Sequence, residues 1–243
     1  GYFQVLQVVR LARLILFKAL GPAPDRLFDC LEFGPGATYT HTSEACHRAD
    51  KLASVGVTSQ ALPYWCQAMC RTQPAWLSAL GFYGVYDSAG QLHLSARRLE
   101  RLVRAGRLQA VRIVPGDRFS SVPKNARTNR TITIGPSGNV SLQLAAAKYL
   151  EKACRKLGVD VHNQVLSSAM IRGTQWSNGL LDVATLDAKN SSNSITTALI
   201  RLLFPSDWFA ALDAIRSHSC DMKDGSGALQ VHTYEMFSGM GNG

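Results

Sequence analysis

The sequence predicts a fold that mixes helices and short strands, on three observations. Residues 2–20 and 139–157 have the apolar periodicity and the end signals of long helices. Residues 110–114, 118–122 and 130–134 have the composition of short strands, and the last of them alternates between polar and apolar side chains. The length of 243 residues suits one large domain or two small ones. Helices and short strands therefore share a chain that is long enough to bury a core.

The first element expected is an amphipathic helix over residues 2–20. Gly21-Pro22 ends it, because neither residue favours continuing a helix. Arg10, Arg13 and Lys18 interrupt its apolar residues, so it lacks the uninterrupted run of a membrane span and no membrane association is expected. Its predicted apolar stripe consists of Val5, Val8, Ala12, Ile15 and Ala19.

A glycine-rich loop and three helices are expected next. Residues 33–38, Phe-Gly-Pro-Gly-Ala-Thr, have a turn-forming composition. Ser43 can cap a short helix that extends to about residue 54. Two further helices are predicted over residues 58–70 and 74–80, and Pro74 suits the first turn of the second.

The middle of the chain predicts a hairpin and a basic helix. Residues 83–86 and 91–94 flank the turn Asp87-Ser88-Ala89-Gly90, which is typical of a β-hairpin. A helix is expected over residues 95–106, with Gly106 at its end. The three short strands follow it.

The C-terminal part predicts mainly helices and two strands. Asn139 is expected to cap the helix 139–157, and Gly158 to end it. Residues 180–187 predict a buried, mostly apolar strand that ends in an acid. The other segments expected are helices over 162–171, 194–204 and 206–217, a strand over 229–236 and a turn-rich loop over 237–243.

Positive charge is concentrated in residues 97–130. The whole chain has a formal net charge of +9, and this tract alone holds ten basic and two acidic residues, a net of +8. Such a concentration indicates a polyanionic partner, although a solvated helix face would also explain part of it. The basic residues are Arg97, Arg98, Arg101, Arg104, Arg107, Arg112, Arg118, Lys124, Arg127 and Arg130.

Two places have side chains that could bind a metal ion or phosphate groups. Asp187, at the end of a predicted buried strand, can hold a divalent cation, although an isolated Asp there is also a common turn former. Asp182 cannot assist from the same strand, because a separation of five puts the two side chains on opposite faces. Lys124, Arg127 and Arg130 recur at a spacing of three in an extended basic loop or ribbon that can bind a triphosphate or a nucleic-acid backbone.

Taken in order, these segments resemble the RNA-dependent RNA polymerase of levivirus-type single-stranded RNA bacteriophages. Residues 33–38 resemble the family's early Gly-Pro-Gly-Ala motif, and residues 122–143 its basic fingers motif. Residues 158–164 are similar to the family's Gly-hydrophobic-Asp-hydrophobic-x-x-Gln segment. Residues 186–195 resemble its first palm motif, and residues 237–243 resemble its second palm motif. The order and spacing of the five segments make the resemblance specific.

The resemblance implies RNA-templated RNA synthesis by a two-metal mechanism. Asp187 would be the catalytic ligand of Mg²⁺ (or Mn²⁺), and Lys124, Arg127 and Arg130 would neutralise the triphosphate of the incoming nucleotide. The implied partners are template RNA, nucleoside triphosphates and host translation proteins, in the cytoplasm of a bacterial host. The residues implied to hold the template and the nucleotide ribose are Asn193, Ser238, Gly239 and Asn242.

The resemblance also implies an α+β fold, the right-hand polymerase fold, with mostly helical fingers and an antiparallel palm sheet. Residues 1–170 would form the N-terminal and fingers-like region, and residues 171–243 an incomplete start of the palm. The family's Gly-Asp-Asp motif would lie downstream, so we expect this chain to be an inactive piece in which strands 180–187 and 229–236 lack their sheet partners. The alternative is a non-catalytic RNA-binding module that uses residues 97–130.

Three positions depart from the family's pattern. Asn129 stands where the family usually has Asp, and Asn193 stands where it often has Asp. Gly135 stands where the family usually has Glu. An Asn can still donate and accept hydrogen bonds, so ribose recognition by Asn193 is compatible with the change. Gly135 removes a carboxylate that could orient a neighbouring Arg.

Overall fold

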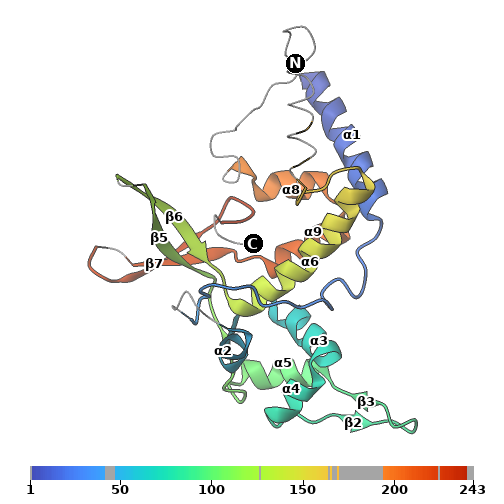
Figure 1. Ribbon diagram of the computed structural model, residues 1–243, viewed down its shortest axis with the longest axis vertical. Coiled ribbons are helices and arrows are strands. Elements are labelled where there is room, and N and C mark those ends of the chain that lie inside the picture. Colours follow the sequence, from blue (N-terminus) through green and yellow to red (C-terminus); the bar gives the residue numbers. More distant parts are fainter. Residues whose placement is uncertain are drawn as a thin grey trace.

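The computed structural model describes residues 2–41, 47–125, 127–163, 165, 169, 194–223 and 225–239. A long N-terminal helix lies at one end of the molecule, and a unit of short helices with a small hairpin lies at the other (Figure 1). The β5–β6 hairpin projects to one side between them. The helices described are α1 (Tyr2–Leu20), α2 (Arg48–Ala53), α3 (Leu62–Thr72), α4 (Pro74–Ala79), α5 (Ala96–Arg104), α6 (Ser137–Lys156), α8 (Thr197–Leu203) and α9 (Ser206–Ile215).

The strands form three sheets. β1 (Val55–Val57) pairs in parallel with β4 (Val111–Ile113), and β2 (Val85–Tyr86) pairs antiparallel with β3 (Leu92–His93). The third sheet has the order β6-β5-β7-β8, with β5–β6 and β7–β8 antiparallel and β5–β7 parallel. Its strands are β5 (Asp117–Asn125), β6 (Thr128–Ile134), β7 (Ser219–Lys223) and β8 (Leu229–Thr233).

Most predicted elements are confirmed where the structure describes them. The predicted hairpin, the basic helix and the helices over 194–204 and 206–217 are present as β2–β3, α5, α8 and α9. Pro74 lies in the first turn of α4, and Gly106 and Gly158 adopt positive φ angles of 65° and 78° just beyond α5 and α6. Segment 180–187, the proposed cap Ser43 and most of 162–171 lie outside the described residues.

Helix α1 confirms its predicted bounds but only part of its predicted stripe. Val5, Val8 and Ile15 are exposed, whereas Leu16 and Leu20 are the large side chains of α1 that pack against the core. The contact therefore lies on one side of the C-terminal end of α1. None of the described helices combines the length and the hydropathy that a membrane-spanning helix requires.

The prediction that residues 229–236 lack a sheet partner was wrong. β8 pairs with β7 over five residues, and β7 in turn pairs with β5. Strand β7 was not predicted, because Ser-Cys-Asp-Met-Lys contains no β-branched or aromatic residue. The described sheet is also mixed rather than wholly antiparallel.

The predicted cap at Asn139 was also wrong. Helix α6 begins at Ser137, after Pro136, and Asn139 is a fully buried residue of its first turn. Its side-chain oxygen accepts from Thr58 N at 2.9 Å, and its side-chain nitrogen donates to Thr58 Oγ1 and Ile215 O, each at 2.9 Å. Asn139 thereby joins α6 to the end of β1 and to the end of α9.

The core lies where the short-helix unit, which contains α2 to α5, meets α6. Trp65, Leu99 and Leu142 are fully buried in it, and Trp65 packs edge-on against Trp76. Gly138 allows α6 to approach β1 closely, because a Cβ there would lie 2.9 Å from the Cβ of Val57. This junction fixes the end of β6 and the start of α6 in one rigid arrangement.

Candidate functional site

A cleft lies between the glycine-rich loop 34–38 and the β5–β6 hairpin. Its volume is about 830 Å³. The loop forms one wall, and residues 118–123 and 132–135 form another. Lys51 and Arg118 are its cationic lining residues, and none of the described residues that line it carries a carboxylate. The cleft is therefore suited to an anion.

The glycine-rich loop is tied to the rest of the molecule at both ends. Lys51 is buried, and its ammonium group donates to the carbonyl of Gly34. Just beyond the loop, Tyr39 N donates to Gly135 O at 2.9 Å, which joins the chain to the end of β6. A buried ammonium is tolerated only where hydrogen bonds compensate its lost hydration, so Lys51 couples the shape of this loop to α2.

The register of β5 and β6 places basic side chains on the cleft face. Arg118, Ser120 and Val122 alternate along β5, and Val122 pairs with Arg130 of β6. Paired residues of neighbouring strands point to the same face, so Arg130 shares the face of Arg118. The predicted extended basic ribbon is thus confirmed, with Arg127 and Arg130 exposed at its tip. The side chain of Lys124 lies outside the described residues.

The segment around Ser238 and Gly239 lies against the opposite face of the same strand pair. A Cβ on Gly239 would overlap Thr133 Oγ1, so the backbone of Gly239 contacts β6 directly. Thr133 also borders the cleft, but its side chain has the opposite parity to those of Ile132 and Ile134 and meets Gly239. The glycine-rich loop and residues 237–239 thus sandwich the base of the hairpin.

Gly239→Ala is expected to destabilise the protein by about 1–3 kcal/mol, because the added methyl group would overlap the side chain of Thr133, which would have to shift. Urea denaturation measures this change. Thr133→Ala removes the two nearest atoms, so the double variant should recover most of the loss. An equal stability of Gly239→Ala and the parent would contradict the close contact.

Two other segments of the resemblance also lie together. Phe237 N donates to Ile195 O at 2.8 Å, Thr197 N donates to Glu235 O at 3.0 Å, and Thr196 forms a β-bridge with Met236. The residues that directly follow Asn193 are therefore fixed beside those that directly precede Ser238. Asp187, Asn193 and Asn242 themselves lie outside the described residues.

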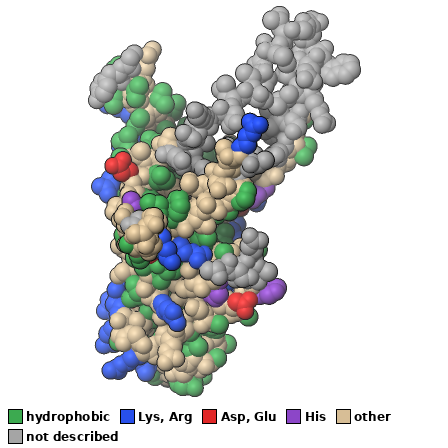
Figure 2. All heavy atoms as spheres, turned by 90° about the vertical axis from the view of Figure 1, so that its left-hand side faces the viewer, with side chains coloured by type: hydrophobic (Ala, Val, Ile, Leu, Met, Phe, Trp, Pro, Cys, Tyr) green, Lys and Arg blue, Asp and Glu red, His purple; other side chains and the backbone are tan. Residues whose placement is uncertain are grey.

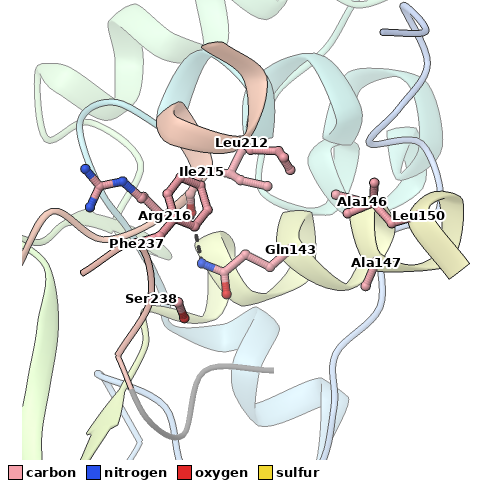
Figure 3. A pocket seen from close by; sticks show the side chains of 9 residues that line it. All are labelled: Gln143, Ala146, Ala147, Leu150, Leu212, Ile215, Arg216, Phe237 and Ser238. Atoms are coloured by element: carbon pink, nitrogen blue, oxygen red, sulfur yellow. Dashed lines mark hydrogen bonds between the residues drawn. The ribbon is translucent and has the colours of Figure 1, made fainter. Parts of the chain in front are cut away.

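A smaller apolar pocket lies behind Ser238. It has a volume of about 170 Å³ and lies between α6, α9 and residues 237–238. Figure 3 shows Gln143 between α9 and Ser238, with its side-chain nitrogen donating to Ile215 O at 3.0 Å. The guanidinium of Arg216 lies 5.4 Å from the ring centroid of Phe237. Gln143, which belongs to the basic motif, therefore joins α6 to the end of α9 and lines the same pocket as Ser238.

The described sheet contains two buried carboxylates, Asp117 and Asp221. Asp117 pairs in register with Cys220, the residue before Asp221, so the two acids lie on opposite faces and cannot share an ion. The described residues contain no group of three His, Cys, Asp or Glu side chains that could hold a metal. A metal role for Asp187 stays a prediction.

The basic tract 97–130 is divided between two parts of the molecule. Residues 97–112 belong to α5, β4 and their connection in the short-helix unit, whereas residues 117–130 belong to the projecting hairpin and its sheet. Figure 2 shows Lys and Arg side chains over the lower part and the middle of one face, with few acidic side chains visible among them. Arg104 is neutralised by Glu100 at 2.8 Å.

Sequence reasoning missed Lys51, Tyr39 and Asp221, and it placed Arg118 only in the general tract. Tyr39 donates to Asp221 Oδ2 at 2.5 Å, although the two are 182 residues apart. Burial and this acid raise the pKa of the Tyr39 hydroxyl to about 12, so it stays protonated and donates. The alternation of Arg118 with Ser120 and Val122 was the one sequence signal that could have placed Arg118 on the face of Arg130.

Comparison with known proteins gives a consistent result. A family model described as "RNA replicase, beta-chain" matches residues 2–243. The chain is 37% identical over 131 residues to the RNA-directed RNA polymerase subunit beta of Escherichia virus Qbeta, covering 54% of this chain and 21% of that protein. It is 33% identical over 132 residues to the RNA-directed RNA polymerase beta chain of Enterobacteria phage GA, covering 54% and 23%.

A more distant relative gives the same picture. The chain is 28% identical over 145 residues to the beta chain of Escherichia phage MS2, covering 60% of this chain and 25% of that protein. The matched part thus spans a quarter or less of the length of these relatives.

Proposed function

The chain belongs to the RNA replicase beta-chain family, and from that premise we propose that it takes part in RNA-templated RNA synthesis in the replication of an RNA bacteriophage. The family assignment confirms the resemblance to bacteriophage replicases. The observation that carries the proposal is the meeting of three motif segments at one strand pair. Residues 34–38 and residues 237–239 lie on opposite faces of the basic β5–β6 hairpin.

Phosphoryl transfer depends on charge neutralisation and positioning rather than on covalent help from the protein. We assign Lys124, Arg127 and Arg130 to the triphosphate of the incoming nucleotide. The exposure of Arg127 and Arg130 at the hairpin tip and the acid-free lining of the neighbouring cleft support this role. The segment of Ser238 and Gly239 would contact template and ribose, together with Asn193 and Asn242.

Asp187 is proposed as the ligand of Mg²⁺ or Mn²⁺. A bound divalent cation would neutralise charge on the phosphates of the nucleotide. Asp117 and Asp221 do not replace Asp187 in this role, since they lie on opposite faces of the sheet. The position of residues 194–197 beside residues 235–237 supports a common site for the segments that carry Asp187 and Ser238.

The domain division, the fold and the partners are also proposals. Residues 1–170 and 171–243 are proposed as a fingers-like region and the start of a palm within a right-hand fold. The mixed α and β content supports an α+β polymerase domain. Template RNA, nucleoside triphosphates and host translation proteins are the proposed partners, inside a bacterial host.

Reversing the charge of the hairpin tip tests the proposal. In a replicase that contains these residues, Arg127→Glu with Arg130→Glu is expected to lower nucleotide incorporation on an RNA template at least about a hundredfold. It should also weaken RNA binding to every sequence alike, because phosphate contacts carry no sequence information. Labelled-nucleotide incorporation and filter binding measure the two effects.

Arg10→Glu with Arg13→Glu is the matched control, because both cations lie on α1, away from the hairpin. Unchanged incorporation in the hairpin variant would contradict the proposed site. A parent protein that binds RNA with this hairpin but incorporates no nucleotide would favour the alternative, a non-catalytic RNA-binding module within residues 97–130. Because the tract is divided, α5 and the hairpin should then make separate contributions to RNA affinity.

A further inference from the structure

Arg118 lies at the base of the cleft, outside the segments that resemble the family's motifs. It is half-buried and lines the cleft beside Ser120 and Thr38. Its Nε atom is buried without a hydrogen-bond partner among the described residues, and it forms no ion pair with any of them. A buried guanidinium donor is costly when unpaired, so its environment is incomplete without a further acceptor.

The acid opposite Arg118 on β7 does not supply that acceptor. Asp221 pairs in register with Arg118 across β5 and β7, and only 4% of its surface is exposed. Its Oδ2 accepts from the Tyr39 hydroxyl at 2.5 Å, while its Oδ1 has no partner among the described residues. Asp221 thus lies beside Arg118 on the same face of the sheet, and Tyr39 holds one of its oxygens. Because no ion pair joins Arg118 to Asp221, the guanidinium is available to the cleft.

The cleft supplies complementary chemistry for a phosphate group. Its described lining combines two cations with the hydroxyls of Thr38, Ser120 and Ser121 and with the backbone of the glycine-rich loop. Arg118 and Arg130 lie on the same face, four residues apart in register along β5, which corresponds to about 13 Å. A guanidinium presents a fork of donors that matches phosphate oxygens.

We propose that Arg118 binds a phosphate group in the cleft and that Tyr39 positions it by holding Asp221 away. This inference deepens the proposed function and rests on it for the source of the phosphate, which is either the RNA strand or the nucleotide triphosphate. The binding test below requires no catalysis. Its failure is therefore distinguishable from failure of the proposed synthesis.

Arg118→Gln is the direct test, in the 243-residue chain. Binding is measured by fluorescence anisotropy with a labelled uridine 20-mer over a range of salt, and by calorimetry with Mg·GTP. We expect about a tenfold loss of affinity for one probe. If affinity falls for the 20-mer, and the slope of log affinity against log salt concentration is reduced by about 0.7, the bound phosphate belongs to the RNA strand. If affinity falls for Mg·GTP alone, the bound phosphate belongs to the triphosphate. Arg118→Lys should retain part of the affinity.

Arg10→Gln on α1 is the matched control and should change neither affinity. Far-ultraviolet circular dichroism and the melting temperature establish that each variant is folded. Unchanged affinity of a folded Arg118→Gln for both probes would overturn the proposal. So would a parent chain that binds neither probe.

The positioning role of Tyr39 has its own test. Tyr39→Phe frees Oδ2 of Asp221, so that both of its oxygens can pair with Arg118 and binding of the same probe should weaken a few-fold. Adding Asp221→Asn removes the competing charge and should restore binding of the probe. A purely structural role for Tyr39 predicts no such rescue, and its absence would refute the positioning role while leaving the Arg118 test intact.

Discussion

Asp187→Ala is expected to abolish nucleotide incorporation by a replicase that contains this chain. Loss of a carboxylate that holds a divalent cation removes charge stabilisation from the transition state, so we expect a fall of at least about a thousandfold. RNA binding depends on the basic side chains and should stay within about twofold of the parent. Incorporation of labelled nucleotide on an RNA template and anisotropy of a labelled RNA measure the two quantities.

Asp182→Ala is the matched control for this prediction. The sequence places Asp182 five residues earlier in the same predicted strand, with its side chain on the opposite face. Its replacement removes the same charge from the same segment and should leave incorporation nearly unchanged. Near-normal incorporation by Asp187→Ala, or an equal loss in both variants, would refute the assignment of Asp187 as the metal ligand.

Local signals were sufficient to predict most of the described elements. Gly106, Gly158 and Pro74 mark helix ends through backbone restrictions that act within a few residues. β7 lacked such a signal, because Ser-Cys-Asp-Met-Lys has low strand propensity and becomes a strand through its pairing with β5 and β8. Pairing partners about a hundred residues apart cannot be identified from local composition.

The candidate site shows the same limit. The basic ribbon was predictable, because Lys124, Arg127 and Arg130 recur within one short extended segment. Its position between the glycine-rich loop and residues 237–239 depends on tertiary contacts, such as those of Tyr39 with Gly135 and Asp221. A single sequence does not show which distant residues are in contact. Only the structure therefore shows that Arg118 Nε lacks a hydrogen-bond acceptor among the described residues.

Asn139→Ala is expected to cause the largest loss of stability among the polar substitutions considered. It removes three hydrogen bonds from a fully buried position and leaves the N–H of Thr58 without its acceptor. Each buried polar group left unpaired costs about 1–3 kcal/mol, so the free energy of unfolding should fall by roughly 3–4 kcal/mol. Such a change is a large fraction of the stability of a typical protein.

Asn129→Ala is the control for this last prediction, because Asn129 belongs to the same motif segment but is exposed on β6. Its effect should stay within about 0.5 kcal/mol. Urea denaturation of both variants gives the comparison, and the melting temperature of Asn139→Ala should fall by on the order of 10 °C. Equal effects of the two substitutions would show that Asn139 does not join α6 to β1 and α9. A selective effect would mean that this motif asparagine supports the site through the fold, by holding α6 against the segments that carry the cleft.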